Sequence, residues 1–290
     1  MANVLTQEKR IGIVSALVEG CSIRSTSRMV GVSKDTVMKL QRELGEACIR
    51  YMDENLRGLK CKRVQADEVW SFVYSKDKNL PEGKDGGSVW TFTAVCADTK
   101  LIPSFLVGSR DTGTATEFAQ DLAGRLESRC QLTTDGGSWY LSAVPDAFGM
   151  DVDYAQLIKI YGPGPEGPEV RYSPAECIGC RSEVISGEPD PKHVSTSYVE
   201  RSNLTIRMQL RRFTRLTNAF SKKIEHHVAA LGLLFCYYNY CRIHSSIRVT
   251  PCMAAGVTRA PWKVADLVAL LPVYTGEGVK RGSYKARSSN

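Results

Sequence analysis

The sequence lacks the features of membrane, secreted and low-complexity proteins. No segment has about 18 uninterrupted apolar residues, and the first ten residues, MANVLTQEKR, lack the apolar run of a signal peptide. There is no internal repeat and no block of biased composition. Hydrophobic residues make up 43% of the 290 residues and charged residues 24%, which is ordinary for a globular chain. We therefore expect a folded cytoplasmic protein with one large and one small domain and no membrane partner.

A second Cys-x-x-Cys motif is also missing. Cys177 and Cys180 in CIGC have the spacing of zinc ligands, but a structural zinc site needs four ligands. Several of the ten cysteines lie inside apolar runs such as LLFCYYNYC, which is typical of reduced thiols. We expect reduced thiols throughout, with a zinc site at Cys177 and Cys180 as the alternative.

Charge is distributed unevenly along the chain. The net charge is +7, yet residues 63–199 carry −8, whereas residues 1–62 carry +4, residues 200–248 carry +7 and residues 249–290 carry +4. Phosphates need cations and divalent metal ions need carboxylates, so this distribution suits a protein that holds a polyanion against an acidic centre. An unevenly charged, merely solvated surface fits the charge equally well.

Three helices are predicted within the first 50 residues. Thr6 is a candidate N-cap for the first, Gly31 marks a turn after a short second helix, and Ser33 is a candidate N-cap for the third. A short helix, a glycine-containing turn and a helix with a polar first turn form the helix-turn-helix pattern, whose second helix enters the major groove of DNA. A plain three-helix bundle is the alternative. The residues expected to face DNA are Lys34, Asp35, Thr36 and Lys39.

After residue 62 the hydrophobic pattern becomes strand-like. Three segments rich in valine, phenylalanine and tryptophan predict successive strands: RVQADEVWSFVYS, SVWTFTAVCADT and LIPSFLVGS. Helices at 113–129 and 138–149 then alternate with strands at 131–136 and 151–162. This order predicts an α/β fold, a mixed sheet with helices on its faces.

The predicted domain organisation follows from these segments. An all-α helix-turn-helix domain spans 1–50, and a polar linker spans 51–62. The α/β domain spans 63–245 and contains a Pro- and Gly-rich irregular insertion at 162–194, followed by helices at 197–217 and 222–242. A C-terminal extension, 246–290, ends in the basic tail VKRGSYKARSSN.

Three acidic residues fall at positions where such a fold presents side chains to a cleft. Asp67 lies in the first strand, Asp135 ends a short strand before a Gly-Gly turn, and Glu200 lies in the first turn of a helix otherwise rich in arginine. Indexing that helix at 100° per residue separates an apolar face from a charged one. The apolar face holds Val199, Ile206, Leu210 and Phe213, and the charged face holds Glu200, Arg207 and Arg211.

Such a trio of carboxylates can bind two divalent cations. A metal pair about 4 Å apart activates an attacking oxygen and stabilises a leaving one in phosphodiester displacement, and arginines hold the phosphates. Taken singly, Asp67 could be a solvated strand residue, Asp135 a turn residue and Glu200 a favourable charge at a helix N-terminus. Glu68 could compete with Asp67, although strand alternation turns the two side chains to opposite faces. Together with the helix-turn-helix, the three residues favour a metal-dependent nucleic-acid enzyme.

Several of these segments resemble one known family. ADEVWSFV, TTDG and STSYVERSNLTIRMQLRRFTRLTNAFSKK, followed by YYNYCRIHSSIRVTPCMAAGV, resemble the DDE transposases of bacterial insertion sequences, in particular the group named for the first-numbered insertion sequence. The resemblance runs from the helix-turn-helix to about Val257 and is most specific in the last block. It implies an RNase H-like, retroviral-integrase-type catalytic domain. Carried over residue by residue, the catalytic and metal-binding triad is Asp67, Asp135 and Glu200.

The resemblance also implies an activity and its partners. These are Mg²⁺-dependent (or Mn²⁺-dependent) DNA nicking and strand transfer with two ions, and binding of the element's terminal inverted repeats and of target DNA. Holding two ends together implies a homodimer or larger assembly, in the nucleoid region of a bacterial cytoplasm. A structure-specific nuclease of the same fold and a helix-turn-helix transcriptional regulator are the alternatives.

Basic residues outside the helix-turn-helix are expected to contact DNA as well. Asn239, Arg242 and His244 match the family's helix-end motif and could touch DNA, support the active site or simply cap the helix. The DNA-contacting residues expected outside the helix-turn-helix are Arg207, Arg211, Arg212, Arg215, Lys222, Lys223, Arg242 and His244.

Overall fold

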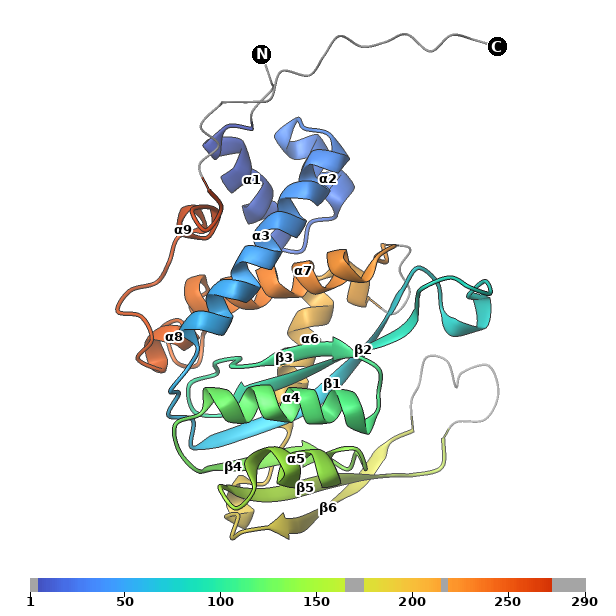
Figure 1. The fold of residues 1–290 in the computed structure, drawn as a ribbon, viewed down its shortest axis with the longest axis vertical. Coiled ribbons are helices and arrows are strands. Elements are labelled where there is room, and N and C mark those ends of the chain that lie inside the picture. The colour runs from blue at the N-terminus through green and yellow to red at the C-terminus, as the bar shows by residue number, and fades with distance from the viewer. Residues whose placement is uncertain (1–4, 165–174, 215–218, 273–290) are drawn as a thin grey trace.

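The computed structural model describes residues 5–164, 175–214 and 219–272 (Figure 1). The expected basic tail and Arg215 lie outside the described residues. Within them, no helix combines the length and the apolar composition needed to cross a membrane.

The three predicted N-terminal helices are confirmed as α1 (Gln7–Val18), α2 (Ile23–Val30) and α3 (Lys34–Asn55). The hydroxyl of Thr6 accepts a hydrogen bond from the Lys9 amide, and Ser33 does the same for Thr36, so both predicted caps form. Gly31 ends α2 in the left-handed conformation (φ 66°), which glycine adopts without strain. Helix α3 continues to Asn55, five residues into the segment predicted as a linker.

A six-stranded sheet forms the centre of the molecule (Figure 1). Its strands are β1 (Arg63–Val73), β2 (Gly87–Cys96), β3 (Phe105–Gly108), β4 (Cys130–Asp135), β5 (Val152–Tyr161) and β6 (Cys177–Ser186). The strand order is β3-β2-β1-β4-β5-β6, with β1 to β3 antiparallel, β4 and β5 parallel to β1, and β6 antiparallel to β5. This mixed sheet has the RNase H-like arrangement, so the predicted fold class is confirmed.

Helices cover both faces of the sheet. Helices α4 (Thr112–Arg125) and α5 (Tyr140–Phe148) pack against each other on one face (Figure 1). Helix α6 (Ser197–Gln209) contacts β1 and β2 on the other face. Successive side chains of β1 alternate between the two faces, so neighbouring β1 residues can contact α5 and α6 respectively.

Helix α7 (Ile224–Cys236) crosses α3 at close range and continues into a π-helical turn, η5 (Tyr237–Cys241). A Cβ atom added to Gly45 of α3 would lie 2.0 Å from the carbonyl oxygen of Ala229. One added to Gly232 of α7 would lie 2.4 Å from Cγ1 of Ile49. Glycine on both helices is therefore what allows the two backbones to approach this closely.

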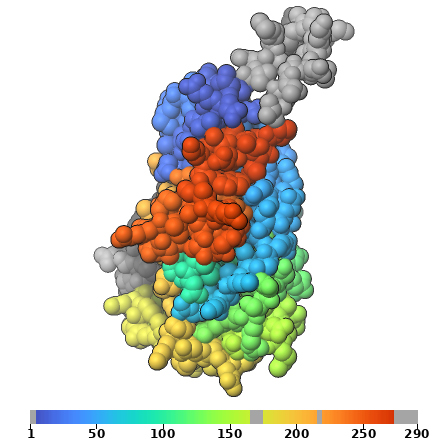
Figure 2. Space-filling model, turned by 90° about the vertical axis from the view of Figure 1, so that its left-hand side faces the viewer, coloured from blue at the N-terminus to red at the C-terminus, as the bar shows by residue number. Residues whose placement is uncertain are grey.

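The C-terminal segment packs between the N-terminal helices and the rest of the molecule (Figure 2). It contains α8 (Pro251–Ala254) and α9 (Val264–Val268), and α9 packs on α1 and α3. The Trp262 ring lies between Tyr51 of α3 and Tyr240 of η5, with centroid separations of 5.0 and 4.6 Å. One buried apolar cluster runs from α1 through the sheet to α9. The predicted domain limits stay predictions, but the segments they separate share this core.

Two expectations about secondary structure were wrong. The insertion at 162–194 is not irregular throughout, because Cys177–Ser186 forms β6 and pairs with β5, and Pro191–His193 forms a short 3₁₀ helix, η3. The helix expected at 197–217 ends at Gln209, because Leu210 is extended. Arg211–Phe213 then forms a separate 3₁₀ turn, η4. A further 3₁₀ turn, η1 (Asp77–Asn79), lies between β1 and β2.

Candidate active site

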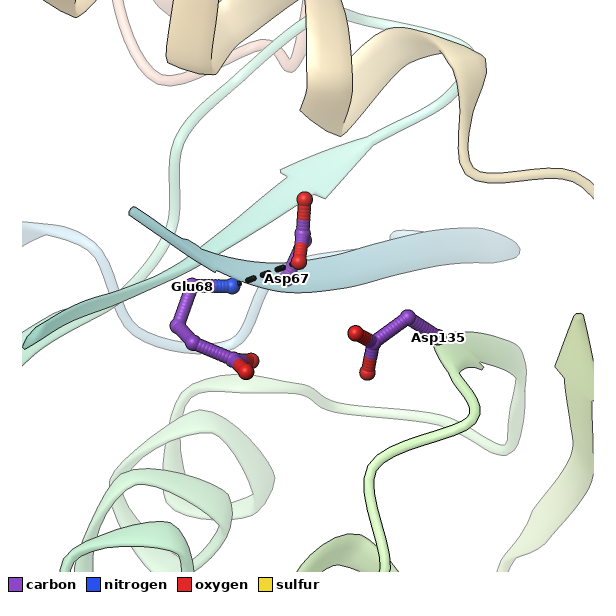
Figure 3. A group of neighbouring side chains, drawn as sticks. All are labelled: Asp67, Glu68 and Asp135. Atoms are coloured by element: carbon purple, nitrogen blue, oxygen red, sulfur yellow. Dashed lines mark hydrogen bonds between the residues drawn. The ribbon is translucent and has the colours of Figure 1, made fainter. Parts of the chain in front are cut away.

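Asp67 lies in the middle of β1, beside the point where the ladder to β4 ends. The backbone amide of Glu68 donates to its Oδ1 at 2.8 Å. The side-chain amide of Asn203, from α6, donates to its Oδ2 at 2.9 Å. Asp67 therefore points to the face of the sheet covered by α6, in the orientation that Figure 3 shows.

Asp135 is the last residue of β4 and faces the same region. Its Oδ1 accepts a hydrogen bond from the backbone amide of Gly137 at 3.1 Å, so the Gly-Gly turn holds the carboxylate. Because β1 and β4 are adjacent and parallel, the end of β4 lies next to Asp67. The carboxylates of Asp67, Glu68 and Asp135 each offer an oxygen within 4.8 Å of the others.

Glu200 lies in the first turn of α6, whose N-terminus is held by β1. The side-chain oxygen of Gln65 accepts hydrogen bonds from the amides of Tyr198 and Val199, at 2.8 and 3.2 Å. It thereby satisfies two amides that a helix N-terminus leaves unpaired. Gln65 is two residues before Asp67 and points to the same face, so this cap fixes Glu200 relative to Asp67. The Glu200 carboxylate accepts from the Thr196 hydroxyl and lies 2.7 Å from the Lys159 ammonium.

The three predicted acids line one pocket of about 480 Å³. Asp67 enters it from β1, Asp135 from β4 and Glu200 from α6, as the sequence predicted. The same pocket is lined by two basic residues, Arg110 and Lys159, and by two aromatic ones, Trp139 and Tyr161. It is therefore an open, acidic site with cations at its rim.

Burial and mutual repulsion raise the pKa values of Asp67 and Asp135 in this pocket. Burial, followed by the charges of Asp135, Glu68 and Glu200, raises the pKa of Asp67 to about 7, against the lowering effect of the Glu68 amide. Burial also raises the pKa of Asp135, although the Gly137 amide, Arg110 and Lys159 oppose the shift. Negative charge is thus only partly compensated here, which is the condition that a bound divalent cation relieves.

Glu68 leaves β1 on the opposite side from Asp67, as strand alternation predicted (Figure 3). Its longer side chain nevertheless brings an oxygen into the acidic group with Asp67 and Asp135. Arg110 donates to its Oε1 at 2.7 Å and the Tyr140 hydroxyl donates to its Oε2 at 3.0 Å. Both oxygens therefore have protein donors, as those of Asp67 and Glu200 do too. What distinguishes Glu68 is that its fully buried carboxylate is already neutralised by the guanidinium of Arg110.

The residues predicted to face DNA from the third helix lie at its exposed start. Lys34, Asp35 and Lys39 are exposed, and Lys39 is within 3.7 Å of Glu43. Thr36 is half-buried, and its hydroxyl shares a hydrogen bond with the capping hydroxyl of Ser33 at 2.9 Å. The assignment of DNA binding to this helix remains a prediction.

Four further predicted contacts lie at the surface. Lys222 and Lys223 are exposed just before α7, and Arg242 is exposed just after η5. His244 is half-buried and contacts the Ser246 hydroxyl at 3.0 Å. Burial, Lys100, Arg242 and Arg201 lower its pKa, so its ring does not gain a charge as readily as a free histidine.

Of the arginines on and after α6, Arg212 is the one engaged in contacts inside the protein. The residue is half-buried, and its guanidinium donates to Ser221 Oγ, the His226 carbonyl and Gln41 Oε1, at 2.7, 2.6 and 3.1 Å, while its expected contact with DNA remains a prediction. Burial lowers its pKa to about 10. Arg211 is exposed, but in η4 and not on the helix that carries Glu200 and the half-buried Arg207.

The structure gives Asn239 a role outside the alternatives stated for the helix-end motif, because its side chain joins η5 to the backbone of Ile102. Its fully buried amide donates to the Ile102 carbonyl at 2.8 Å and accepts from the Ile102 amide at 3.0 Å. Cys177 and Cys180 are free and exposed on β6, where Cys180 is opposite Lys159.

Arg110, Lys159 and Trp139 were not identified from the sequence. Of the three, only Lys159 has a signal in the sequence that could have identified it. It interrupts a run of apolar residues near the end of the strand that pairs with the strand of Asp135. Arg110 and Trp139 lie in connections that carry no local signal of a site.

Comparisons with known proteins give distant structural similarities. No protein-family model and no curated protein matches the sequence. A simian T-cell lymphotropic virus intasome, solved with the PP2A regulatory subunit B56 gamma, is 12% identical, with a TM-score of 0.40 over 94% of this chain and 80% of that chain. A piggyBac transposase synaptic complex with hairpin DNA is 11% identical, with a TM-score of 0.35 over 94% and 78%. A Mos1 transposase paired-end complex is 12% identical, with a TM-score of 0.25 over 53% and 60%. These TM-scores are below 0.5, so the fold assignment rests on the strand order.

Proposed function

We propose that this protein is a DDE transposase that binds the terminal inverted repeats of an insertion sequence and catalyses DNA nicking and strand transfer. The observation that carries the proposal is the convergence of Asp67, Asp135 and Glu200 from three separate elements on one pocket. The motifs that resemble the transposases of insertion sequences, and the two basic residues that line the pocket, Arg110 and Lys159, support it.

The residues of the pocket fit divalent cations. Carboxylate oxygens are the ligands that Mg²⁺ and Mn²⁺ prefer. Burial first, and then the neighbouring carboxylates, raise the pKa of Asp67, and a bound cation would offset both effects. Asp67, Asp135 and Glu200 would hold the ions, two in number. When bound, the ions would activate the attacking oxygen and stabilise the leaving one.

The chain's own residues position the substrate around that centre. Asn203 and the Glu68 amide orient the Asp67 carboxylate, and the Gly137 amide orients Asp135. Lys159 neutralises Glu200 and stands at the rim where DNA phosphates would enter. Lys34 and its neighbours on α3 would read the element's ends, and a dimer or larger assembly in the bacterial cytoplasm would hold two ends together.

A joining assay tests the proposal. A labelled DNA end, taken from inverted repeats that flank the coding region, is incubated with the protein, a plasmid and Mg²⁺ or Mn²⁺. We expect the label to be joined to the plasmid, with no joining when a chelator replaces the metal and no normal turnover with Ca²⁺. Metal-dependent cutting without joining would instead identify a nuclease. Sequence-specific binding without cutting would identify a regulator.

A further inference from the structure

Arg110 is held between two tryptophan rings at the edge of the candidate active site. Its guanidinium carbon lies 4.3 Å from the ring centroid of Trp90, in β2, and 4.3 Å from that of Trp139, which immediately precedes α5. A guanidinium stacks on aromatic faces because it is planar and weakly hydrated. Two such faces restrict the Arg110 side chain to one plane.

Glu68 fixes the guanidinium within that plane. Nε and Nη2 of Arg110 both lie 2.7 Å from Glu68 Oε1, and the Glu68 side chain is fully buried. The hydroxyl of Tyr140, itself buried, donates to the other oxygen of Glu68. A buried carboxylate held by two partners is a rigid anchor, because moving it would leave a buried charge without a partner.

Arg110 lines the pocket that also contains Asp67, Asp135 and Glu200. Within the described residues, Glu68 is the acceptor that the guanidinium contacts, and Nη1 is not used in that contact. Lys159, the other cation lining the pocket, is already paired with Glu200 at 2.7 Å. Arg110 therefore presents a pre-oriented donor to an incoming anion.

We propose that Arg110 binds a non-bridging oxygen of one phosphate of the DNA strand that is cut and joined in this pocket. Glu68, Trp90 and Trp139 are positioning residues that hold Arg110 for that contact. The proposal rests on the proposed function, since it takes the substrate to be a DNA strand. It assigns Glu68 to Arg110 and not to the metal site.

The test combines protein variants with neutral phosphates. Strand-transfer rates are measured for the wild type, Arg110→Lys and Arg110→Ala on DNA that carries a single methylphosphonate, moved one phosphate at a time along the bases that flank the cut. We expect one position at which the neutral group slows the wild type by about 10- to 100-fold, the range for a charge-assisted hydrogen bond. On unmodified DNA, Arg110→Ala should transfer strands more slowly than the wild type by a similar factor. The methylphosphonate at that position should not slow Arg110→Ala any further, because both changes remove the same contact.

The lysine variant separates this contact from simple charge. Arg110→Lys keeps the charge but loses the planar fork and the stacking. We therefore expect its strand-transfer rate to be reduced nearly as much as that of Arg110→Ala. Glu68→Gln, which keeps the shape, should slow transfer while retaining part of the sensitivity at the same phosphate. Arg129→Ala is the matched control, because Arg129 is paired with Asp153 at 2.6 Å and does not line the pocket.

Two results with the variants would overturn the proposal for Arg110, and a third, with the wild type, would overturn the proposed function instead. If the losses from Arg110→Ala and the methylphosphonate multiply at every position, Arg110 contacts none of these phosphates. Full activity of Arg110→Lys at every position would show that charge alone is needed. If the wild type gives no metal-dependent joining at all, the proposed function itself has failed, and the comparison of variants does not arise.

Discussion

Asp67 should make the metal-free protein less stable as the pH rises. Its pKa is raised to about 7 in the folded protein, chiefly by burial. Between the ordinary aspartate pKa and about 7 the folded state therefore binds a proton that the unfolded state has released. The free energy of unfolding should fall across this range, by at most about 1.4 kcal/mol per pH unit for one proton.

Urea denaturation in the presence of a chelator, from pH 4.5 to 8, measures this slope. Asp67→Asn should flatten it and should be more stable than the wild type at pH 8. The control is Asp153→Asn, because hydrogen bonding to Arg129 lowers the pKa of Asp153. That carboxylate stabilises the fold above its unfolded pKa and loses this effect as the pH falls. An unchanged slope in Asp67→Asn would show that Asp67 does not carry the shift.

Replacing each of two neighbouring arginines, Arg211 and Arg212, with alanine should affect different properties of the protein, DNA binding in one case and stability in the other. Arg211 is exposed, so Arg211→Ala should leave the melting temperature unchanged and reduce the salt slope of DNA binding by about 0.9, the value for one lost phosphate contact. Arg212→Ala leaves buried acceptors without a donor, so it should destabilise the fold by about 1 to 3 kcal/mol or more. Thermal melts and salt-dependent gel shifts on both variants check this. Equal stability of the two would contradict the inward orientation of Arg212.

The placement of some side chains follows from the local sequence, whereas the contacts of others depend on residues distant in the chain. The placement of Asp67, Asp135 and Glu200 could be predicted, because each acid lies at a strand position or helix start that the local pattern defines, while their role as a triad stays a prediction. The inward turn of Arg212 could not, because it depends on Leu210 leaving the helix and on acceptors from Gln41 and His226. The stacking of Arg110 could not be predicted either, since its two tryptophans are distant in sequence.

At the scale of elements, the crossing of α3 and α7 depends on glycine. Gly45→Ala would place a methyl group 2.0 Å from the Ala229 carbonyl oxygen, so the helices must separate. We expect a loss of about 1 to 3 kcal/mol, typical of overpacking, despite the better helix propensity of alanine. Urea denaturation of the purified variant measures the loss.

Gly12→Ala is the matched control for this substitution. Gly12 also lies in a helix, but an added Cβ would meet Val30 at 3.7 Å, an ordinary contact. Alanine there should be neutral or stabilising by up to about 1 kcal/mol. Similar stabilities for the two variants would show that the helices do not need glycine at their crossing.

Most elements of the sheet could be predicted, and β6 could not. Strands β1 and β2 have the valine and aromatic content of strands, and β4 ends in a Gly-Gly turn. Strand β6 lies at an outer edge of the sheet and most of its residues are exposed, the apolar Ile178 and Val184 among them, so its pairing with β5 leaves no alternation of buried apolar and exposed polar residues. The prolines and glycines on either side of it predicted an irregular segment instead of a strand.

At the scale of the whole molecule, the acidic pocket and the predicted DNA-reading helix lie on different elements of one core. Sequence segments alone indicated separate domains, because helical and strand-like patterns change at residue 62. The shared core depends on long-range contacts of α3 with α7 and of α9 with α1, which no local pattern encodes. Chemistry and end recognition should still be separable by mutation, because their residues do not overlap.

Glu200→Gln tests the central claim most directly, with gel-shift affinity, strand-transfer rate and thermal melting measured on the same preparations. The glutamine keeps the shape of the side chain and removes the charge that would bind metal. We expect strand transfer to fall by orders of magnitude, while binding to the element's ends and the fold are retained. Glu183→Gln, an exposed change on β6 outside the pocket, should remain active. Near-normal strand transfer by a folded Glu200→Gln protein would contradict the account, because Glu200 would then contribute only the 0.3 to 1 kcal/mol or so of a charge at a helix N-terminus.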